Sequence, residues 1–155
     1  MLTTMTSTPR LSEAGETLIK QLAEVVGTAQ VLTVPADIAP YVTDWRGRFR
    51  GAARCVVRPG NVAEVAAVVR LCAAARVPVV PQGGNTSLCG AATPDAGGAA
   101  VVVSLGRLNR VLAIDTGNNT ITVETGCTLA AVQEAARQAG RLFPLALASE
   151  GTCQI

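Results

Sequence analysis

The sequence predicts an α+β fold, and two patterns carry the prediction: a strand–helix–strand succession in mid-chain and a hairpin followed by a helix near the end. Residues 54–59 (RCVVRP) and 78–81 (PVVP) are short apolar runs on either side of a helical pattern. A strand, a helix and a strand within about 30 residues form a βαβ unit, which implies that the two strands pair in parallel. Residues 110–115 and 120–125 flank the sequence TGNN, which suits a tight turn between two antiparallel strands.

Capping residues mark the ends of two predicted helices. The helix between the first two strands begins at Asn61, its N-cap, and Glu64 stands at the third helical position, close to a capping box. A later helix is capped by Thr128 and runs through Ala139. Gly140 then ends it, because glycine readily takes the left-handed conformation that follows a helix.

Hydrophobic spacing predicts the remaining elements. Apolar residues recur at helical spacing from residue 12 to about residue 26, which predicts an N-terminal helix. Residues 99–105 (AAVVVSL) do not alternate, so we expect a strand buried on both faces. The stretch 33–51 (TVPADIAPYVTDWRGRFRG) is punctuated by prolines and is predicted to connect the helix to the first strand. Its aromatic residues, expected to pack onto the core, are Tyr41, Trp45 and Phe49.

Composition and charge exclude several classes of function. The chain of 155 residues has no histidine, which excludes an imidazole-activated nucleophile and a histidine metal site within it. A net charge of +2 does not argue for nucleic acid, and no apolar run reaches the roughly 18 residues of a membrane span. The five cysteines form no C-x-x-C pair, and no secretion signal precedes them, which favours free thiols and a cytoplasmic location. Arginines 46, 48, 50 and 54 are interpreted as a solvated edge leading into a strand.

The sequence PQGGNTSLCG at 81–90 raises the main functional question. Glycines let backbone N–H groups converge on an anion, and Thr or Ser hydroxyls add donors, but the same composition suits a plain turn. Two phosphate loops are excluded: a Walker loop needs G-K-[ST], and Lys20 is the one lysine of the chain. The dinucleotide fingerprint needs a helix at its last glycine, whereas Gly90 leads into AATPDAGG. Composition alone leaves a turn and an anion site equally open.

Six segments, taken together, resemble one family. VPVVPQGGNTSLCGA is similar to the pyrophosphate loop of FAD-linked oxidoreductases of the vanillyl-alcohol oxidase type, which carry an FAD-binding PCMH-type domain. The resemblance is strongest to the branch of D-2-hydroxyglutarate and D-lactate dehydrogenases, and it extends from about residue 40 to the end of the chain. The other segments, in order, are DWRGRFRG, VVRPGNVAEVAAVVRLC, VVVSLGRLNRVLAID, NNTITVETGCTLAAVQ and FPLALASEGTCQI.

The resemblance implies a fold and a set of cofactor-binding residues. The fold is two small α/β subdomains, a βαβ unit followed by a mixed sheet with helices, with FAD between them and residues 1–40 as a lead segment and helix ahead of a domain at 41–155. The implied cofactor contacts are the backbone amides of Gly83, Gly84, Asn85, Thr86 and Ser87 around the FAD pyrophosphate, Gln82 before them, Gly126 before the next helix, and Pro144, Ser149, Gly151 and Thr152 along the flavin.

Some residues depart from the family pattern. Ser87 stands where this branch has glycine, which would cost on the order of 1 kcal/mol if the position needs a positive φ. Asn85 occupies the position of a flavin-attaching histidine in some relatives, and an amide is no nucleophile, so the resemblance implies non-covalent FAD. Cys89 and Cys153 are interpreted as packing residues.

The implied activity is oxidation of a D-2-hydroxy acid to a 2-oxo acid by hydride transfer to flavin N5. The family's base, its substrate-carboxylate arginine and its histidine-held metal belong to a later substrate domain, so we expect no catalytic residue and no metal ligand in this chain. The ending EGTCQI resembles the approach to a strand, which favours a piece of a longer protein over a frayed terminus and predicts that this piece alone is inactive.

Several alternatives stay open at this point. The electron acceptor is an electron-transfer flavoprotein, a quinone or a cytochrome, and peripheral association with the inner membrane is compatible with the cytoplasmic location. A flavin oxidase of alcohols or sugars, using oxygen, is the alternative activity, although Gln82 and Asn85 favour a dehydrogenase. A non-catalytic nucleotide-binding fragment is a further alternative.

Overall fold

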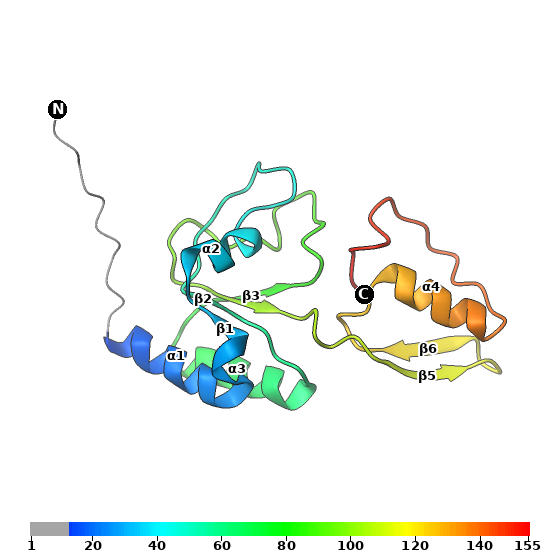
Figure 1. The fold of residues 1–155 in the computed structure, drawn as a ribbon, viewed down its shortest axis with the longest axis horizontal. Helices are drawn as coiled ribbons and strands as arrows, with labels where there is room; N and C mark the ends of the chain where they lie inside the picture. The colour runs from blue at the N-terminus through cyan, green and yellow to red at the C-terminus, as the bar shows by residue number, and fades with distance from the viewer. Residues whose placement is uncertain (1–12) are drawn as a thin grey trace.

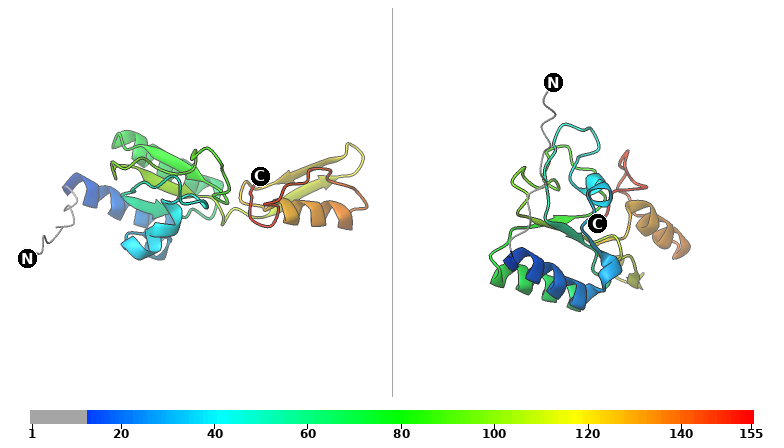
Figure 2. Two further views of the ribbon diagram at one scale, coloured as in Figure 1. Left: turned by 90° about the horizontal axis from the view of Figure 1, so that it is seen from above. Right: turned by 60° about the vertical axis from the view of Figure 1, so that its left-hand side comes forward.

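The computed structural model describes residues 13–155, which form two lobes side by side (Figures 1 and 2). The first lobe is a four-stranded sheet with α1 (Glu13–Val26) and α3 (Val62–Ala74) packed together on it. The second lobe is the hairpin of β5 (Val111–Asp115) and β6 (Thr120–Val123), against which α4 (Leu129–Gln138) packs. The first twelve residues, including the predicted start of the N-terminal helix, lie outside the described residues.

The first sheet has the strand order β1-β2-β4-β3. β2 (Cys55–Val57) and β3 (Val79–Gln82) both pair in parallel with β4 (Val101–Ser104), and β1 (Val31–Leu32) is antiparallel to β2. The parallel direction predicted for the βαβ unit is therefore confirmed. However, the predicted pairing of these two strands with each other is wrong, because β4 lies between β2 and β3 and pairs with both.

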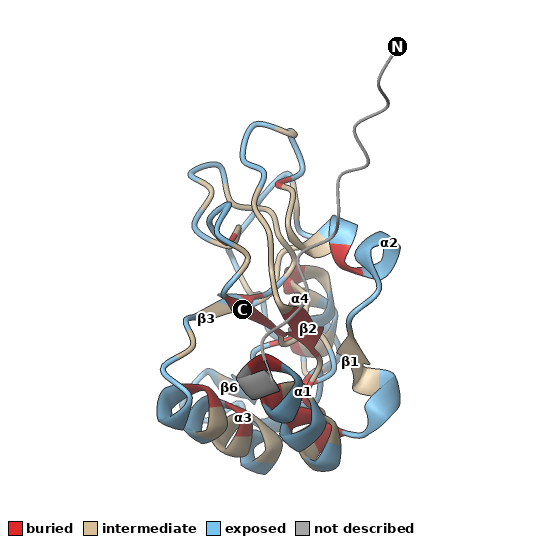
Figure 3. Ribbon diagram, turned by 90° about the vertical axis from the view of Figure 1, so that its left-hand side faces the viewer, coloured by how far each residue is buried: buried red, intermediate tan, exposed pale blue. Residues whose placement is uncertain are grey.

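Side chains of the central strands alternate between two apolar layers, as the period of two along a strand requires. Cys55, Val57, Val101 and Val103 face the layer formed by α1 and α3. Val56 and Val102 face the opposite layer, where they pack with Ile38 and with parts of residues 32–53. All three residues of β2 and the first three of β4 are buried, which confirms the strand predicted to be buried on both faces (Figure 3).

The lead segment and the later strands share one core. Leu18 and Leu22 of α1 pack with Val68 and Cys72 of α3, and β1 continues the sheet at its edge. These contacts do not test the division of the chain at residue 40, which stays a prediction. Between β1 and β2 the chain forms two short helical turns, α2 (Pro35–Ile38) and the 3₁₀ turn Ala39–Tyr41.

The predicted helix caps are confirmed. The Asn61 side chain accepts a hydrogen bond from the Glu64 N–H at 2.9 Å, and Glu64 accepts one from the Gly60 N–H at 2.7 Å. Thr128 accepts from the N–H of Ala131 at 3.2 Å at the start of α4. Beyond the end of that helix, Gly140 has a φ of 68°, in the left-handed region.

The second lobe is a hairpin with one bulge. β5 and β6 pair antiparallel from Val111 with Val123 to Asp115 with Thr120, with an irregularity between Val111 and Ala113. The carboxylate of Asp115 accepts hydrogen bonds from the N–H groups of Gly117 and Asn118 in the predicted turn. Within the described residues the second sheet is thus an antiparallel pair, while the first sheet is mixed.

The predicted packing of the three aromatics is only partly right. Tyr41 packs against the second apolar layer, but Trp45 is 61% exposed and Phe49 is 42% exposed. The guanidinium of Arg46 lies over the Trp45 ring, 4.7 Å from its centroid. The ring of Phe49 lies against Gly90. A Cβ added to that glycine would be only 2.6 Å from the ring. Of the three aromatics of the connecting segment, Tyr41 packs on the core, Phe49 packs on the glycine-rich loop, and Trp45 is exposed to solvent.

Candidate functional site

The glycine-rich loop leaves the sheet at its carboxyl edge. β3 ends at Gln82, whose carbonyl accepts from the N–H of Leu105, so the chain after β4 leaves the same edge beside it. Pro81 is tolerated because β3 is an edge strand, which bonds to β4 through alternate residues and leaves the nitrogen of Pro81 on the open side. The carboxyl edge of parallel strands is where α/β layers bind ligands.

The loop carries a run of backbone donors with no partner in the protein. From Gly83 to Leu88, no backbone N–H donates to an acceptor among the described residues. Residues Gly84 to Ser87 are nevertheless half-buried. Because no other part of the described protein uses these N–H groups, they are available to an external acceptor. The loop thus fits an anion cradle better than a plain turn.

Asn85, rather than Ser87, takes the strained conformation of the loop. Its φ is 53°, in the left-handed region that asparagine tolerates better than most residues. Ser87 has no positive φ, so the cost considered for a serine at this position does not arise. Its hydroxyl instead accepts a hydrogen bond from the N–H of Cys89 at 3.3 Å.

The side chains of Gln82 and Asn85 bind protein carbonyls. Gln82 is 3% exposed, and its Nε2 donates to the carbonyls of Tyr41 and Ala92, both at 2.8 Å. Asn85 donates through Nδ2 to the carbonyls of Thr43 at 2.9 Å and Pro40 at 3.3 Å. Both amide hydrogens of Gln82 are used in this way, so its side chain has no donor left for a phosphate.

The structure brings the glycine loop against the C-terminal segment. A Cβ added at Gly84 would overlap the carbonyl oxygen of Thr152 and lie 2.7 Å from its carbon. At Gly83 it would lie 3.3 Å from Cβ and Oε1 of Gln154. Glycine is therefore required at 84 by close packing, and two separate predicted segments, 83–87 and 149–152, meet in space.

Residues 149–153 form a turn that lies across the start of α4. The Ser149 carbonyl accepts from the N–H groups of Thr152 at 2.8 Å and Cys153 at 2.7 Å, and from the Thr152 hydroxyl at 3.2 Å. The first amides of α4 are also used, since Leu129 donates to the Cys153 carbonyl. The helix N-terminus is thus occupied by protein acceptors, and the loop provides the free donors.

Gly126 packs closely against the backbone of residues 105–108, where the chain passes from the first lobe to the second. Its N–H donates to the Leu108 carbonyl at 2.7 Å, and a Cβ there would lie 2.7 Å from that oxygen and 3.1 Å from Cα of Gly106. Next to it, Glu124 is 7% exposed and accepts from the N–H and the guanidinium of Arg110 at 2.8 and 2.7 Å. The hydrogen bond from Arg110 lowers the pKa of Glu124. The described contacts of Gly126 are with backbone, which explains the glycine without a cofactor.

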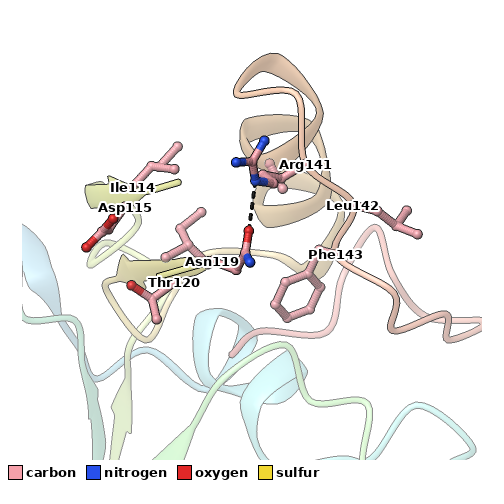
Figure 4. A pocket seen from close by; sticks show the side chains of 9 residues that line it. Ile114, Asp115, Asn119, Thr120, Arg141, Leu142 and Phe143 are labelled. Atoms are coloured by element: carbon pink, nitrogen blue, oxygen red, sulfur yellow. Dashed lines mark hydrogen bonds between the residues drawn. The ribbon is translucent and has the colours of Figure 1, made fainter. Parts of the chain in front are cut away.

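Pro144 lies in the exposed coil after α4, several residues before the turn at 149–152, and it does not belong to that turn. The residue before it, Phe143, lines a cavity of about 130 Å³ between the hairpin and the end of α4 (Figure 4). There Arg141 donates through Nε to Oδ1 of Asn119 at 2.8 Å. This cavity is lined by different residues from those of the glycine loop, so it is not part of the candidate site.

Gln154 is a site residue that the sequence did not single out. Its carboxamide lies against two loops, with Oε1 3.3 Å from a Cβ added at Gly83 and Nε2 3.3 Å from one added at Gly106. Oε1 is buried and has no hydrogen-bond partner among the described residues. Because Oε1 is an acceptor, it could accept a hydrogen bond from a donor group of a ligand, but it cannot bind a phosphate oxygen. Its place in the segment FPLALASEGTCQI was the one available signal.

The cysteines divide into buried and accessible thiols. Cys55, Cys72 and Cys127 are buried, and burial raises the pKa of Cys55 to about 12. Cys153 is half-buried. Cys89 is exposed at the loop, so its interpretation as a packing residue is wrong. Within residues 13–155, no cluster of three or more His, Cys, Asp or Glu side chains is placed to hold a metal ion.

The residues present fit the diphosphate of a dinucleotide. The fit rests on the free amides of 83–88 and on the close packing of Gly84 against Thr152. Such a set supplies hydrogen-bond donors to an anion but no acid or base for proton transfer. The site is therefore suited to binding and positioning a cofactor.

Known proteins are similar to this chain in sequence and in fold. Residues 53–155 match a family described as FAD binding domain. The chain is 40% identical over 137 residues to a D-2-hydroxyglutarate dehydrogenase of Xanthomonas citri pv. viticola, covering 88% of this chain and 29% of that protein. It spans under a third of the length of that relative.

Two solved structures have similar folds. One is an alkyldihydroxyacetonephosphate synthase, with a TM-score of 0.82 and 18% identity over 97% of this chain and 29% of that one. The other is the 4-ethylphenol oxidase from Gulosibacter chungangensis, with a TM-score of 0.70 and 28% identity over 84% of this chain and 25% of that one. The fold class predicted from the resemblance is thereby confirmed. Among residues 13–155, no helix has the length and apolar character needed to cross a bilayer.

Proposed function

The chain belongs to the FAD binding domain family, and from this premise we propose that it forms the cofactor-binding part of a flavin-dependent D-2-hydroxy-acid dehydrogenase. One observation carries the proposal: the amides of 83–88 have no acceptor among the described residues, on a loop that is packed against a second predicted cofactor segment. The choice of substrate class is supported by the name of the 40% identical relative, a D-2-hydroxyglutarate dehydrogenase.

The proposed work of this chain is to bind and position the cofactor. The amides from Gly83 to Ser87 bind the pyrophosphate, and the turn at 149–152 borders the flavin. Bound FAD supplies the acceptor for the hydride that leaves C2 of the 2-hydroxy acid. The proton-accepting base and the group that binds the substrate carboxylate are proposed to lie outside this chain, which has no histidine.

We propose that FAD is held without a covalent bond. Asn85 has no nucleophilic atom, and its Nδ2 donates to Thr43 and Pro40. Flavin that is released on acid or heat denaturation supports this point, and flavin that stays with the polypeptide contradicts it. A cytoplasmic location, with an electron-transfer flavoprotein, a quinone or a cytochrome as acceptor, belongs to the same proposal.

Turnover of the complete protein tests the function. We expect a yellow protein that reduces an artificial electron acceptor with D-2-hydroxy acids and reacts slowly with oxygen. The likeness to a 4-ethylphenol oxidase supports a second candidate, a flavin oxidase. Faster turnover with oxygen than with the artificial acceptor would favour that oxidase. A colourless protein that releases no flavin would contradict both, and flavin binding without turnover of any alcohol would leave a nucleotide-binding role.

A further inference from the structure

We propose that the segment 40–51 is a positioning element for the cofactor loop, fixed in shape by Asp44 and joined to the loop by Gln82 and Asn85. The inference rests on the proposed function, because the loop it positions is the one proposed to bind the FAD pyrophosphate. It assigns a role to the sequence DWRGRFRG, which the cofactor contacts proposed above do not include.

Three carbonyls of the segment accept hydrogen bonds from the loop. Tyr41 accepts from Gln82, and Thr43 and Pro40 accept from Asn85, at distances of 2.8, 2.9 and 3.3 Å. Gln82 stands at the start of the loop, and Asn85 stands in its middle with a φ of 53°. The side chains of Gln82 and Asn85 therefore fix the loop at two points, while its backbone amides from 83 to 88 stay free.

The loop's far side is held by close packing. The ring of Phe49 lies on Gly90, where an added Cβ would be 2.6 Å from the ring. A Cβ at Gly51 would lie 2.7 Å from the carbonyl carbon of Pro94. The N–H of Ala52 donates to the carbonyl of Asp95 at 2.8 Å. Residues 49–52 thus contact residues 90–95, which follow the loop, and residues 40–43 contact the beginning and middle of the loop.

Asp44 holds the segment in this shape. Although it precedes an exposed turn, it is 4% exposed, and its Oδ1 accepts from the N–H of Phe49 at 2.7 Å. Its Oδ2 accepts from the N–H of Arg46 at 3.3 Å, and its own N–H donates to the Phe49 carbonyl at 3.0 Å. The carboxylate therefore closes the turn that places the Phe49 ring on Gly90.

Three substitutions separate positioning from stability. Asn85→Gly keeps access to a positive φ but removes both side-chain donors. Asp44→Ala removes the acceptor for Phe49, whereas Asp44→Asn keeps a side-chain oxygen that accepts the same bond. Asp115→Ala is the matched control, because Asp115 also accepts from two turn amides, in the hairpin and outside the proposed site.

The experiment measures the FAD dissociation constant of the complete protein by flavin fluorescence, with the melting temperature of the FAD-free form beside it. We expect Asn85→Gly and Asp44→Ala to weaken FAD binding roughly tenfold, the equivalent of one or two lost hydrogen bonds. Asp44→Asn should recover most of the affinity, and Asp115→Ala should bind FAD as the unmodified protein does.

Each other result overturns the inference in a recognisable way. Equal FAD affinity in Asn85→Gly and the unmodified protein would show that the side-chain bonds position nothing. Equal losses in Asp44→Ala and Asp115→Ala would reduce the effect to general destabilisation. If Asp44→Ala does not fold, Asn85→Gly decides alone. An unmodified protein that binds no FAD would refute the proposed function itself, and with it the role of the segment.

Discussion

Substitution of Gly84 by alanine tests the contact that joins the two segments proposed to bind the cofactor, 83–87 and 149–152. The new Cβ would overlap the Thr152 carbonyl oxygen and lie 2.7 Å from its carbon, so loop and turn must separate by roughly 1.5 Å to regain normal contact. Both neighbours are backbone, and the turn is held by the hydrogen bonds on the Ser149 carbonyl. Overpacking of this kind costs about 1–3 kcal/mol.

We expect this cost to be visible in two quantities. The FAD-free protein should lose about 1–3 kcal/mol of unfolding free energy, measured by urea denaturation. Because the displaced loop carries the free amides, the FAD dissociation constant should rise about tenfold or more. Gly83→Ala, whose Cβ would be 3.3 Å from the Gln154 side chain, should have a smaller effect on both.

Gly117→Ala is the control for Gly84→Ala. Gly117 lies in the hairpin turn, has no positive φ, and its added Cβ would be 3.2 Å from a side-chain oxygen of Asp115. We expect it to change neither quantity appreciably. If Gly84→Ala binds FAD as tightly as this control does, the close approach of Gly84 to Thr152 does not shape the cofactor loop, and the reasoning is refuted.

Three further predictions concern charge and thiols. Gln154→Glu should weaken FAD binding, and more so at low salt, because a carboxylate would stand beside the pyrophosphate loop; affinity independent of salt and equal to that of the unmodified protein would contradict this. Because its lowered pKa makes Glu124 stabilising above its ordinary value of 4.5, that contribution should disappear as the pH falls through the folded pKa. Glu124→Gln should therefore lower the melting temperature at pH 7 and lower it progressively less as the pH falls below 4.5, and a loss that does not change with pH would exclude the ion pair with Arg110 as the cause. Iodoacetamide should label Cys89 in the folded protein and spare Cys55, whose pKa is about 12, as mass spectrometry of the peptides can check.

The sequence predicted elements whose signals are local. Asn61 with Glu64 and Thr128 with Gly140 mark helix ends by side-chain and backbone chemistry within a few residues, and the structure confirms both helices. The strand predicted at 99–105 and found at Val101–Ser104 has a similar basis, because an unbroken apolar run requires burial on both faces.

Features that depend on distant parts of the chain could not be predicted. The position of β4 between β2 and β3 is set by packing across the sheet, and spacing along the chain does not encode it. The exposure of Trp45 is a similar case, since no pattern distinguishes an aromatic stacked on arginine from one in the core. The place of Gln154 beside Gly83 and Gly106 also depends on the tertiary fold, so the sequence alone could not predict it.

Amide hydrogen exchange of the complete protein tests the central claim most directly. The amides from Gly83 to Leu88 have no acceptor among the described residues, so they should exchange fast in the FAD-free protein. With FAD or ADP bound, we expect marked slowing at these residues, and with riboflavin, which has no pyrophosphate, little change. FAD that binds tightly without slowing exchange anywhere between 83 and 88 would contradict the account.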